Sequence, residues 1–311
     1  MKNTKFNKLK KNVKQLSKEQ IIQIEKFINK TNKQPFISKT LEIESNKLKC
    51  AHCPSYNKVK WGIRNGLQRY KCKNCKKTFN SLSNTPLARL RKKEQWIKYA
   101  ACINKSYTVR KSAKICNVNK NTTFKWRHRF LKSYNFITPK KLIGIIESHN
   151  TFFVKPPNGK KYYPIKNINI ENKEIIQILY FRDRRNYTLE QIINNQFSLL
   201  KERYKHIITK DSLICSNNYS IINKLCKSLN LKHGKLNNEK VKKEIVHINN
   251  VSSYITKQNL WFERFRGVGK KYLHNYLSWY RIRDEKNLRL NPILIIKRSR
   301  SGDKYQPLTN T

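Results

Sequence analysis

Acidic residues are scarce in this chain. Only 18 of its 311 residues are Asp or Glu, against 69 Lys and Arg, so the formal net charge is +51. The positive residues are spread over the whole chain, and so much like charge calls for a polyanionic partner. Aromatic residues make up 11% of the chain, which argues against simple disorder. The composition therefore predicts a folded protein that binds nucleic acid.

Long apolar runs are also missing. No stretch approaches the length that spans a bilayer, and the start of the chain lacks the apolar core of a signal peptide. The basic residues are not gathered in one amphipathic helix, so a membrane surface is a poorer partner than nucleic acid. Glycine is scarce too, while Lys, Asn and Ile abound. Strongly AT-biased coding DNA gives this composition and can account for part of the lysine excess.

Four of the eight cysteines form two Cys-x-x-Cys pairs with eighteen residues between them. This spacing presents four thiolates to one tetrahedral Zn²⁺, and it favours a structural zinc site over four ordinary buried thiols. Asn65-Gly66 suits the turn of a hairpin between the pairs. His52 is a competing candidate ligand. The paired residues are Cys50, Cys53, Cys72 and Cys75.

The other four cysteines stand singly within apolar patterns. We expect them to be buried thiols in a reducing cytoplasm. A DNA-binding protein in that compartment would be associated with the nucleoid. These cysteines are Cys102, Cys116, Cys215 and Cys226.

Three helices are expected after the paired cysteines. Trp96, Tyr99, Ala100 and Ile103 form a helical stripe. Thr108 can cap a second helix over 109–115, and Asn117 suits the left-handed position after it. A third helix is expected over 120–132. The short turn before it indicates a helix-turn-helix unit, and the alternative is a three-helix bundle with a solvated basic face.

The third helix carries the candidate DNA-binding residues. Thr123, Trp126 and Phe130 are expected to face inward. We expect base-edge contacts from Lys120, Asn121 and Lys125, and phosphate contacts from Arg127, His128 and Arg129.

From residue 143 onward, apolar runs alternate with helical patterns, which indicates an α/β domain. Strands are expected over 143–147 with 151–154, and over 168–170, 175–181 and 213–215. Helices are expected over 188–203, 218–229 and 251–283, with a basic loop over 232–246. Near the start of the chain, Ser17 and Gln20 resemble a capping box that begins a helix over 17–30.

Taken in order, these parts resemble a bacterial insertion-sequence transposase. The group has a zinc ribbon, a helix-turn-helix and an ISXO-type DDE domain, and is related to eukaryotic Merlin elements. The resemblance covers roughly residues 17–285. The matching motifs are the cysteine quartet with 77–80, then 85–91, 124–130, 144–147 with 151–152, 182–184, His247 with 250–251, Trp261, 264–268, 271–273, and 275–277 with Trp279.

The resemblance implies an α/β fold class in which a zinc ribbon and helix-turn-helix precede an RNase H-like domain. Such a domain would bind two Mg²⁺ ions on carboxylates and cut and join DNA by in-line attack. Terminal inverted repeats would be the DNA partner, and the protein would act as a homo-oligomer on paired ends. The expected segments are a basic N-terminal helix and linker (1–40), a zinc ribbon (41–82), a helix-turn-helix domain (83–138), an RNase H-like transposase domain (139–290) and a basic tail (291–311).

The positions that hold metal-binding acids in this family are not acidic here. His149 and Asn217 stand where the first and second Asp belong. Ser252 stands at the third position, which is Glu, Asn or His among relatives. A common Lys seven residues later is Asn259. Glu147 would share a strand face with His149 and is the one carboxylate expected near the site, although a purely structural role is the alternative.

Three functions follow from these observations. The first is a transposase-like protein that still binds element-end DNA but has lost strand transfer. The second is an active DDE-type transposase with an atypical metal site that uses Glu147. The third is a zinc-ribbon regulator that binds nucleic acid without preferring inverted repeats. Zinc is the expected structural cofactor in each, and Mg²⁺ is expected only if catalysis survives. We favour the first.

Overall fold

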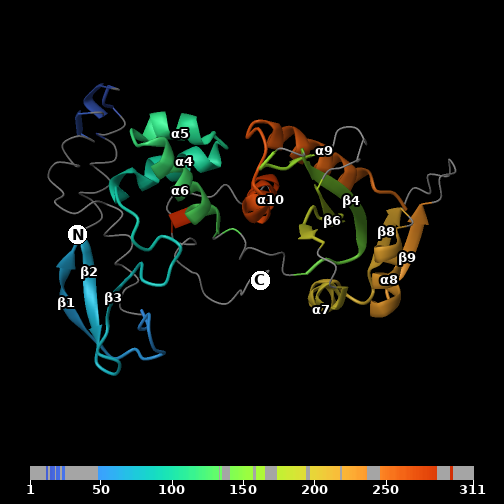
Figure 1. Cartoon of the computed structure of the whole chain (residues 1–311), viewed down its shortest axis with the longest axis horizontal. Coiled ribbons are helices and arrows are strands. Elements are labelled where there is room, and N and C mark those ends of the chain that lie inside the picture. Colours follow the sequence, from blue (N-terminus) through green and yellow to red (C-terminus); the bar gives the residue numbers. More distant parts are fainter. Residues whose placement is uncertain are drawn as a thin grey trace. The chain divides into compact units, whose positions relative to one another are not determined.

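The computed structural model describes residues 48–132, 134, 141–156, 159–164, 174–193, 197–217, 219–236, 246–285 and 295–296, and a few positions between 12 and 24 (Figure 1). The chain forms two compact units, Met1–Tyr99 and Ala100–Thr311. The boundary falls within helix α4 (Trp96–Asn104). Helices and sheets together give a mixed α/β fold, as expected. The finer five-part division stays a prediction.

The first unit contains a three-stranded antiparallel sheet in the order β1-β2-β3. Asn65 and Gly66 join the first two strands, and their φ angles of 51° and 71° are both positive. A two-residue type I′ hairpin turn needs this backbone geometry, so the predicted turn is confirmed. The strands are β1 (Lys58–Arg64), β2 (Leu67–Cys72) and β3 (Thr78–Asn80).

The second unit begins with helices whose ends are fixed by local hydrogen bonds. In α5 (Val109–Cys116), the Thr108 side chain accepts a hydrogen bond from the Lys111 backbone N–H at 3.3 Å. Asn117 ends the helix with a left-handed φ of 49°. Both predicted caps are therefore confirmed. The next helix, α6 (Lys120–Lys132), buries the three residues predicted to face inward, Thr123, Trp126 and Phe130.

A six-stranded mixed sheet organises the rest of the second unit. Its main path runs β7-β6-β4-β8-β9, and β5 pairs with β4. The first three strands of this path are antiparallel, whereas β8 and β9 run parallel to their neighbours. The strands are β4 (Ile145–Lys155), β5 (Tyr163–Pro164), β6 (Glu174–Asp183), β7 (Thr188–Ile192), β8 (Leu213–Asn217) and β9 (Lys232–Leu236).

Helices cover both faces of this sheet. Successive residues of a strand point to opposite sides, so buried residues of one strand contact helices on both faces. On β6, Leu179 and Phe181 belong to a core cluster that includes Tyr204 and Leu225 from α7 and α8. Tyr180 lies between them and donates a hydrogen bond to Gln258 on α9 instead. The helices are α7 (Phe197–Ile207), α8 (Ser220–Leu229), α9 (Asn249–Glu263) and α10 (Lys270–Asp284).

Two predicted segments are wrong. The helix expected over 188–203 is strand β7 followed by helix α7, because residues 188–192 pair with the buried strand β6. Helical spacing of the apolar residues was misleading, since pairing with a neighbouring strand overrides a local pattern. The loop expected over 232–246 includes strand β9, which pairs in parallel with β8. Its lysines are typical of an edge strand.

Other predicted elements hold. Two predicted apolar segments form the single strand β4, and the predicted helical stretch 251–283 is the pair α9 and α10. Ser17 and Gln20 exchange the two hydrogen bonds of a capping box, at 3.0 and 3.3 Å. The strand expected over 168–170, most of the helix over 17–30 and most of the tail from 291 lie outside the described residues. Within the described part of the chain, every helix is too short or too polar to span a bilayer.

Candidate metal centre and nucleic-acid interface

The four paired cysteines meet at one point of the first unit. Cys50 and Cys53 precede β1, whereas Cys72 ends β2 and Cys75 lies in the turn before β3. Their four Sγ atoms all lie within 4.8 Å of one another. The Cys50–Cys75 and Cys53–Cys72 pairs are each 3.6 Å apart. Four Zn–S bonds of about 2.3 Å in a tetrahedron set sulfurs about 3.8 Å apart, so the cluster can hold a zinc ion.

Two of these closely packed thiols have pKa values shifted in opposite directions. The backbone N–H of Cys75 is the largest influence that lowers the pKa of Cys72, to about 6. At Cys53, the Ser55 backbone N–H acts in the same direction, but desolvation and the other thiols outweigh it and raise the pKa to about 11. The first thiolate to form therefore makes the next one harder to form. A divalent cation removes that penalty, as expected at a metal site.

His52 does not join the cysteine cluster. Its backbone N–H donates to the Cys50 Sγ at 3.3 Å, while its ring Nε2 lies 3.4 Å from the backbone oxygen of Thr78. Among the described residues, the four cysteines are the one group of three or more His, Cys, Asp and Glu side chains whose ligand atoms come together. A site of four sulfurs with no open position is typical of structural zinc, not catalytic zinc.

Helix α6 exposes most of the side chains predicted to contact DNA. Asn121, Lys125 and Arg129 follow one another at intervals of four residues, so they lie along one stripe of the helix. All three are exposed, as is Lys120 at the beginning of the helix. The stripe is therefore accessible to a large ligand. Whether it reads bases or phosphates stays a prediction.

Arg127 needs a correction, because its side chain is fully buried. Its guanidinium donates a hydrogen bond to the backbone oxygen of Tyr107 and lies 4.9 Å from the ring centroid of Trp279. The neighbouring His128 ring stacks on Tyr272 of α10 at 3.4 Å. These two residues hold α6 against α10, and the phosphate contacts predicted for them do not fit these positions.

Glu147 is buried on β4, and both of its carboxylate oxygens are occupied. Oε2 accepts the Val251 backbone N–H at 2.8 Å, and Oε1 accepts the Asn250 side-chain amide at 2.9 Å. Arg184 forms an ion pair with Oε1 at 3.1 Å, and His247 Nδ1 lies 3.4 Å away. The carboxylate thus binds the N-terminal turn of α9, where the helix dipole favours negative charge. This arrangement supports the structural alternative for Glu147.

Sequence reasoning gave no role to Arg184 or His247, although both lie in motifs that carry the resemblance. Arg184 Nη1 also bonds to His247 Nε2 at 2.6 Å, so the two side chains support each other around Glu147. The available signal was the presence of both residues in separate matching motifs. Nothing in a linear pattern says that such motifs meet at one carboxylate.

The four positions that replace the acids and lysine of the family lie on β4, β8 and α9. Ser148 and Ser216 are opposite one another in the parallel ladder, so the next residues, His149 and Asn217, are neighbours at its end. Ser252 follows the Val251 that bonds to Glu147. Burial lowers the pKa of His149, whose Nδ1 has no hydrogen-bond partner among the described residues. The described structure offers Mg²⁺ no carboxylate at these positions.

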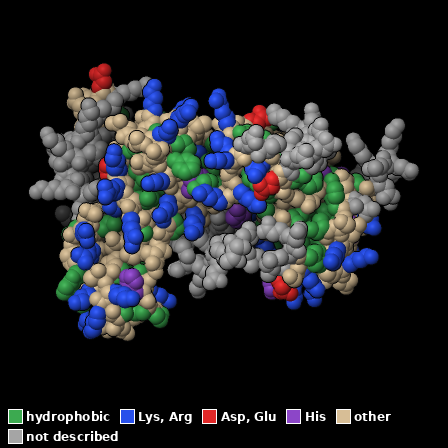
Figure 2. Space-filling model, in the orientation of Figure 1, with side chains coloured by type: hydrophobic (Ala, Val, Ile, Leu, Met, Phe, Trp, Pro, Cys, Tyr) green, Lys and Arg blue, Asp and Glu red, His purple; other side chains and the backbone are tan. Residues whose placement is uncertain are grey.

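Basic side chains are widely distributed over the surface. Figure 2 shows Lys and Arg scattered over the visible face, with few Asp or Glu among them. No model of a known protein family matches this chain, and no curated protein is similar to it. Its function must therefore be inferred from its own residues and their arrangement.

Proposed function

We propose that this chain is a transposase-like DNA-binding protein of an insertion sequence, which recognises element-end DNA and no longer carries out strand transfer. The observation that carries this proposal is the cluster around Glu147. Glu147, Arg184, His247, Asn250 and Val251 come from three motifs of the resemblance, and they contact one another around one carboxylate. Three separate motifs of the resemblance thus meet at one site, which supports the family assignment.

The finer architecture belongs to the same proposal. The three-stranded sheet with its four cysteines would be a zinc ribbon, and α4, α5 and α6 would be a helix-turn-helix. The mixed sheet, in which β4 is central and β8 lies parallel to it, supports an RNase H-like domain. The exposed α6 stripe would contact DNA, with Lys120, Asn121 and Lys125 at base edges and Arg129 at phosphates. A homo-oligomer would engage two element ends.

Loss of catalysis is supported by the donors around Glu147. A metal ion there would have to displace the Val251 N–H and approach the cationic Arg184. Two-metal catalysis needs several oxygen ligands around a pair of ions. His149, Asn217 and Ser252 supply an imidazole, an amide and a hydroxyl, and none of the three supplies a carboxylate. We therefore favour a binding protein over an active transposase that uses Glu147.

The test uses labelled DNA that carries the inverted repeats flanking the gene. Mobility shift and end cleavage are measured on the same samples while Mg²⁺ or Mn²⁺ is titrated. A shift that prefers the repeats over scrambled DNA, without cleavage, is the expected result. Metal-dependent cleavage at the element end would restore the active-transposase hypothesis. Equal binding to repeat and scrambled DNA would favour a regulator of another class.

A further inference from the structure

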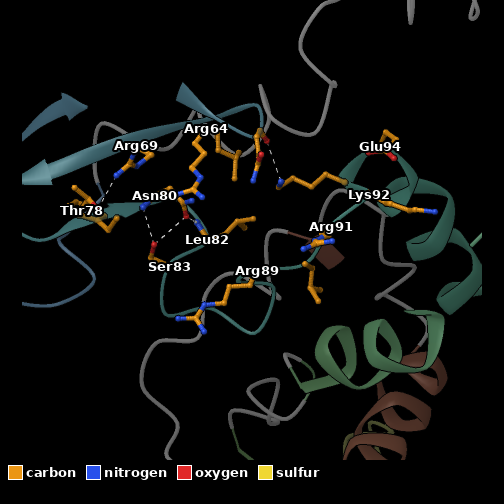
Figure 3. Close-up of a pocket in the computed structure, with 15 residues that line it drawn as sticks. Arg64, Arg69, Thr78, Asn80, Leu82, Ser83, Arg89, Arg91, Lys92 and Glu94 are labelled. Atoms are coloured by element: carbon orange, nitrogen blue, oxygen red, sulfur yellow. Dashed lines mark hydrogen bonds between the residues drawn. The ribbon is translucent and has the colours of Figure 1, made fainter. Parts of the chain in front are cut away.

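A strongly basic pocket lies within the first unit, whereas α6 belongs to the second. It has a volume of about 750 Å³ and is formed by the sheet on one side and the segment after β3 on the other. Arg64 and Arg69 come from the sheet, whereas Arg89, Arg91 and Lys92 come from that following segment. Figure 3 shows Arg64 and Arg69 on one side of the hollow, and Arg89 and Arg91 on the other.

Positive charge in this pocket is largely uncompensated. Glu94 is the one acidic residue that lines it. Among the described residues, no ion pair involves Arg64, Arg89 or Arg91, and Arg69 donates a hydrogen bond to the neutral Thr78 hydroxyl at 3.3 Å. Several guanidinium groups close together repel one another. Such an arrangement is stabilised when an anion binds between them.

The segment that supplies Arg89 and Arg91 is held in a fixed shape by its own hydrogen bonds. The Asn80 and Ser83 side chains close a turn with bonds of 2.9 to 3.2 Å, and Leu87 is fully buried beneath the segment. Arg89 has a left-handed φ of 61°, a conformation that a non-glycine residue adopts only when its surroundings require it. The two arginines are therefore presented on a preorganised loop.

The lining also indicates what kind of anion fits. Pockets for small organic ligands are predominantly apolar and aromatic. Here Phe79 is the one aromatic residue in the lining, and it is only 3% exposed, so no ring is available to stack on a base. Guanidinium groups suit phosphate oxygens because they donate paired hydrogen bonds. The chemistry matches a phosphodiester backbone better than a nucleobase or a small apolar molecule.

We propose that this pocket binds backbone phosphates of duplex DNA, as a second contact surface besides α6. The proposal rests on the DNA-binding function given above and assigns a role to the 85–91 motif. Backbone contacts carry no sequence information but contribute affinity and fix the orientation of the protein on DNA. The sheet wall of the pocket includes Thr78, Phe79 and Asn80, which follow directly after the cysteine cluster. A zinc ion there would hold this wall in place.

The experiment measures binding of the full-length protein to two labelled duplexes over a series of KCl concentrations. One duplex carries the terminal inverted repeat and the other a scrambled sequence. The pocket variant is Arg89→Gln with Arg91→Gln. Its matched control, Lys73→Gln with Lys77→Gln, removes the same charge from exposed positions of the first unit outside the pocket. Zinc content and thermal melting verify that each variant is folded.

Each lost phosphate contact makes the slope of log K against log[salt] shallower by about 0.9. The pocket variant should therefore lose roughly 2 from the slope on both duplexes, with its preference for the repeat unchanged. Arg64→Gln, on the opposite wall, should lose roughly 1. The control should keep the wild-type slope. An unchanged slope in the pocket variant, or equal losses in pocket variant and control, would overturn the proposal.

The two proposals fail in different ways. If wild-type protein does not prefer the inverted repeat but the pocket variant still loses salt dependence, the pocket assignment stands and the transposase-like function falls. If the wild type prefers the repeat but the pocket substitutions have no effect, the transposase-like function stands and the pocket assignment falls. Titration calorimetry with inorganic pyrophosphate tests whether the pocket binds a small phosphate ligand. Saturable binding of pyrophosphate to the wild type alone, with duplex binding unaffected by the substitutions, would assign the pocket to a small phosphate ligand instead of DNA.

Discussion

Glu147 on β4 accepts a hydrogen bond of 2.8 Å from the backbone N–H of Val251, at the beginning of α9. The contact ties the central strand of the sheet to a helix 104 residues further along the chain. Because Arg184 pairs with the same carboxylate, the site combines a helix N-terminus, a cation and a buried acid. A residue expected as a remnant of catalysis thus has a complete set of structural partners.

Glu147→Gln should destabilise the protein. The substitution removes the negative charge that balances Arg184, and breaking a buried pair in this way costs roughly 3 kcal/mol of unfolding free energy. Urea unfolding measures the loss. Glu202→Gln, at an exposed position of α7, is the control and should change stability by less than about 0.5 kcal/mol. If the wild type performs metal-dependent end cleavage and Glu147→Gln abolishes it at unchanged stability, Glu147 is a catalytic ligand instead.

Cys72→Ser should release zinc and unfold residues 48–80. The cysteines make up half of the small core around β2, so few other side chains can hold these strands together without the metal. Zinc per chain, measured by atomic emission, and protease sensitivity of the segment are the two measurements. Cys226→Ala, in α8 of the second unit, should leave the zinc content unchanged. Retention of one zinc per chain by Cys72→Ser would refute the four-cysteine site.

Lys125→Ala should weaken binding to the preferred DNA sequence more than binding to scrambled DNA. Lys125 is exposed in the middle of the α6 stripe, where a base contact would contribute about 1 to 3 kcal/mol of discrimination. Thermal stability should not change, since the side chain is exposed. The two affinities are compared at one fixed salt concentration. Equal losses on both sequences would make Lys125 a phosphate contact.

Arg127→Ala, two residues further along the same helix, should lower the stability of the protein instead of its preference for one DNA sequence. It removes a buried hydrogen bond to Tyr107 and the stacking of the guanidinium on Trp279. We expect a loss of about 3 kcal/mol in unfolding free energy, from a charge-assisted hydrogen bond and a desolvated cation–π contact together. If the variant keeps wild-type stability but binds DNA more weakly, Arg127 contacts DNA as the sequence analysis predicts.

The elements predicted well are those fixed by local chemistry. The helix α6 begins and ends where the sequence predicts, and Thr108 and Asn117 cap α5 as expected, because a cap depends on a few adjacent residues. The two-residue turn at Asn65-Gly66 and the cysteine cluster follow from equally short patterns. Spacing alone was sufficient in each case.

The elements predicted poorly depend on partners far away in the sequence. Strand β9 contains Lys232 and Lys235 and resembles a loop until β8 pairs with it. The burial of Arg127 depends on aromatic residues of α10, about 150 positions later. The role of Glu147 likewise depends on a helix that no local pattern connects to β4. Folding brings these groups together, and a single sequence records none of those distances.

His128 should make stability depend on pH in the acid range. Desolvation against Tyr272, helped by the charges of Arg127 and Lys271, lowers its pKa to about 3. The ordinary histidine value of about 6.5 applies in the unfolded chain. Between these two values the unfolded state binds more protons than the folded state, so unfolding becomes easier as the pH falls from about 6.5 toward 3. Above pH 6.5 both states are neutral at this position and the contribution is constant.

His128→Phe isolates this contribution because phenylalanine can keep the stack on Tyr272 but cannot be protonated. The variant should lose less stability than wild type between about pH 6.5 and 4, measured by urea unfolding at a series of pH values. His274, with a pKa lowered to about 4 by burial, is present in both proteins and cancels in the comparison. His206→Phe, at an exposed position of α7, controls for the loss of a histidine. Parallel pH profiles for wild type and His128→Phe would show that the ring is not held in the neutral form by its contact with α10.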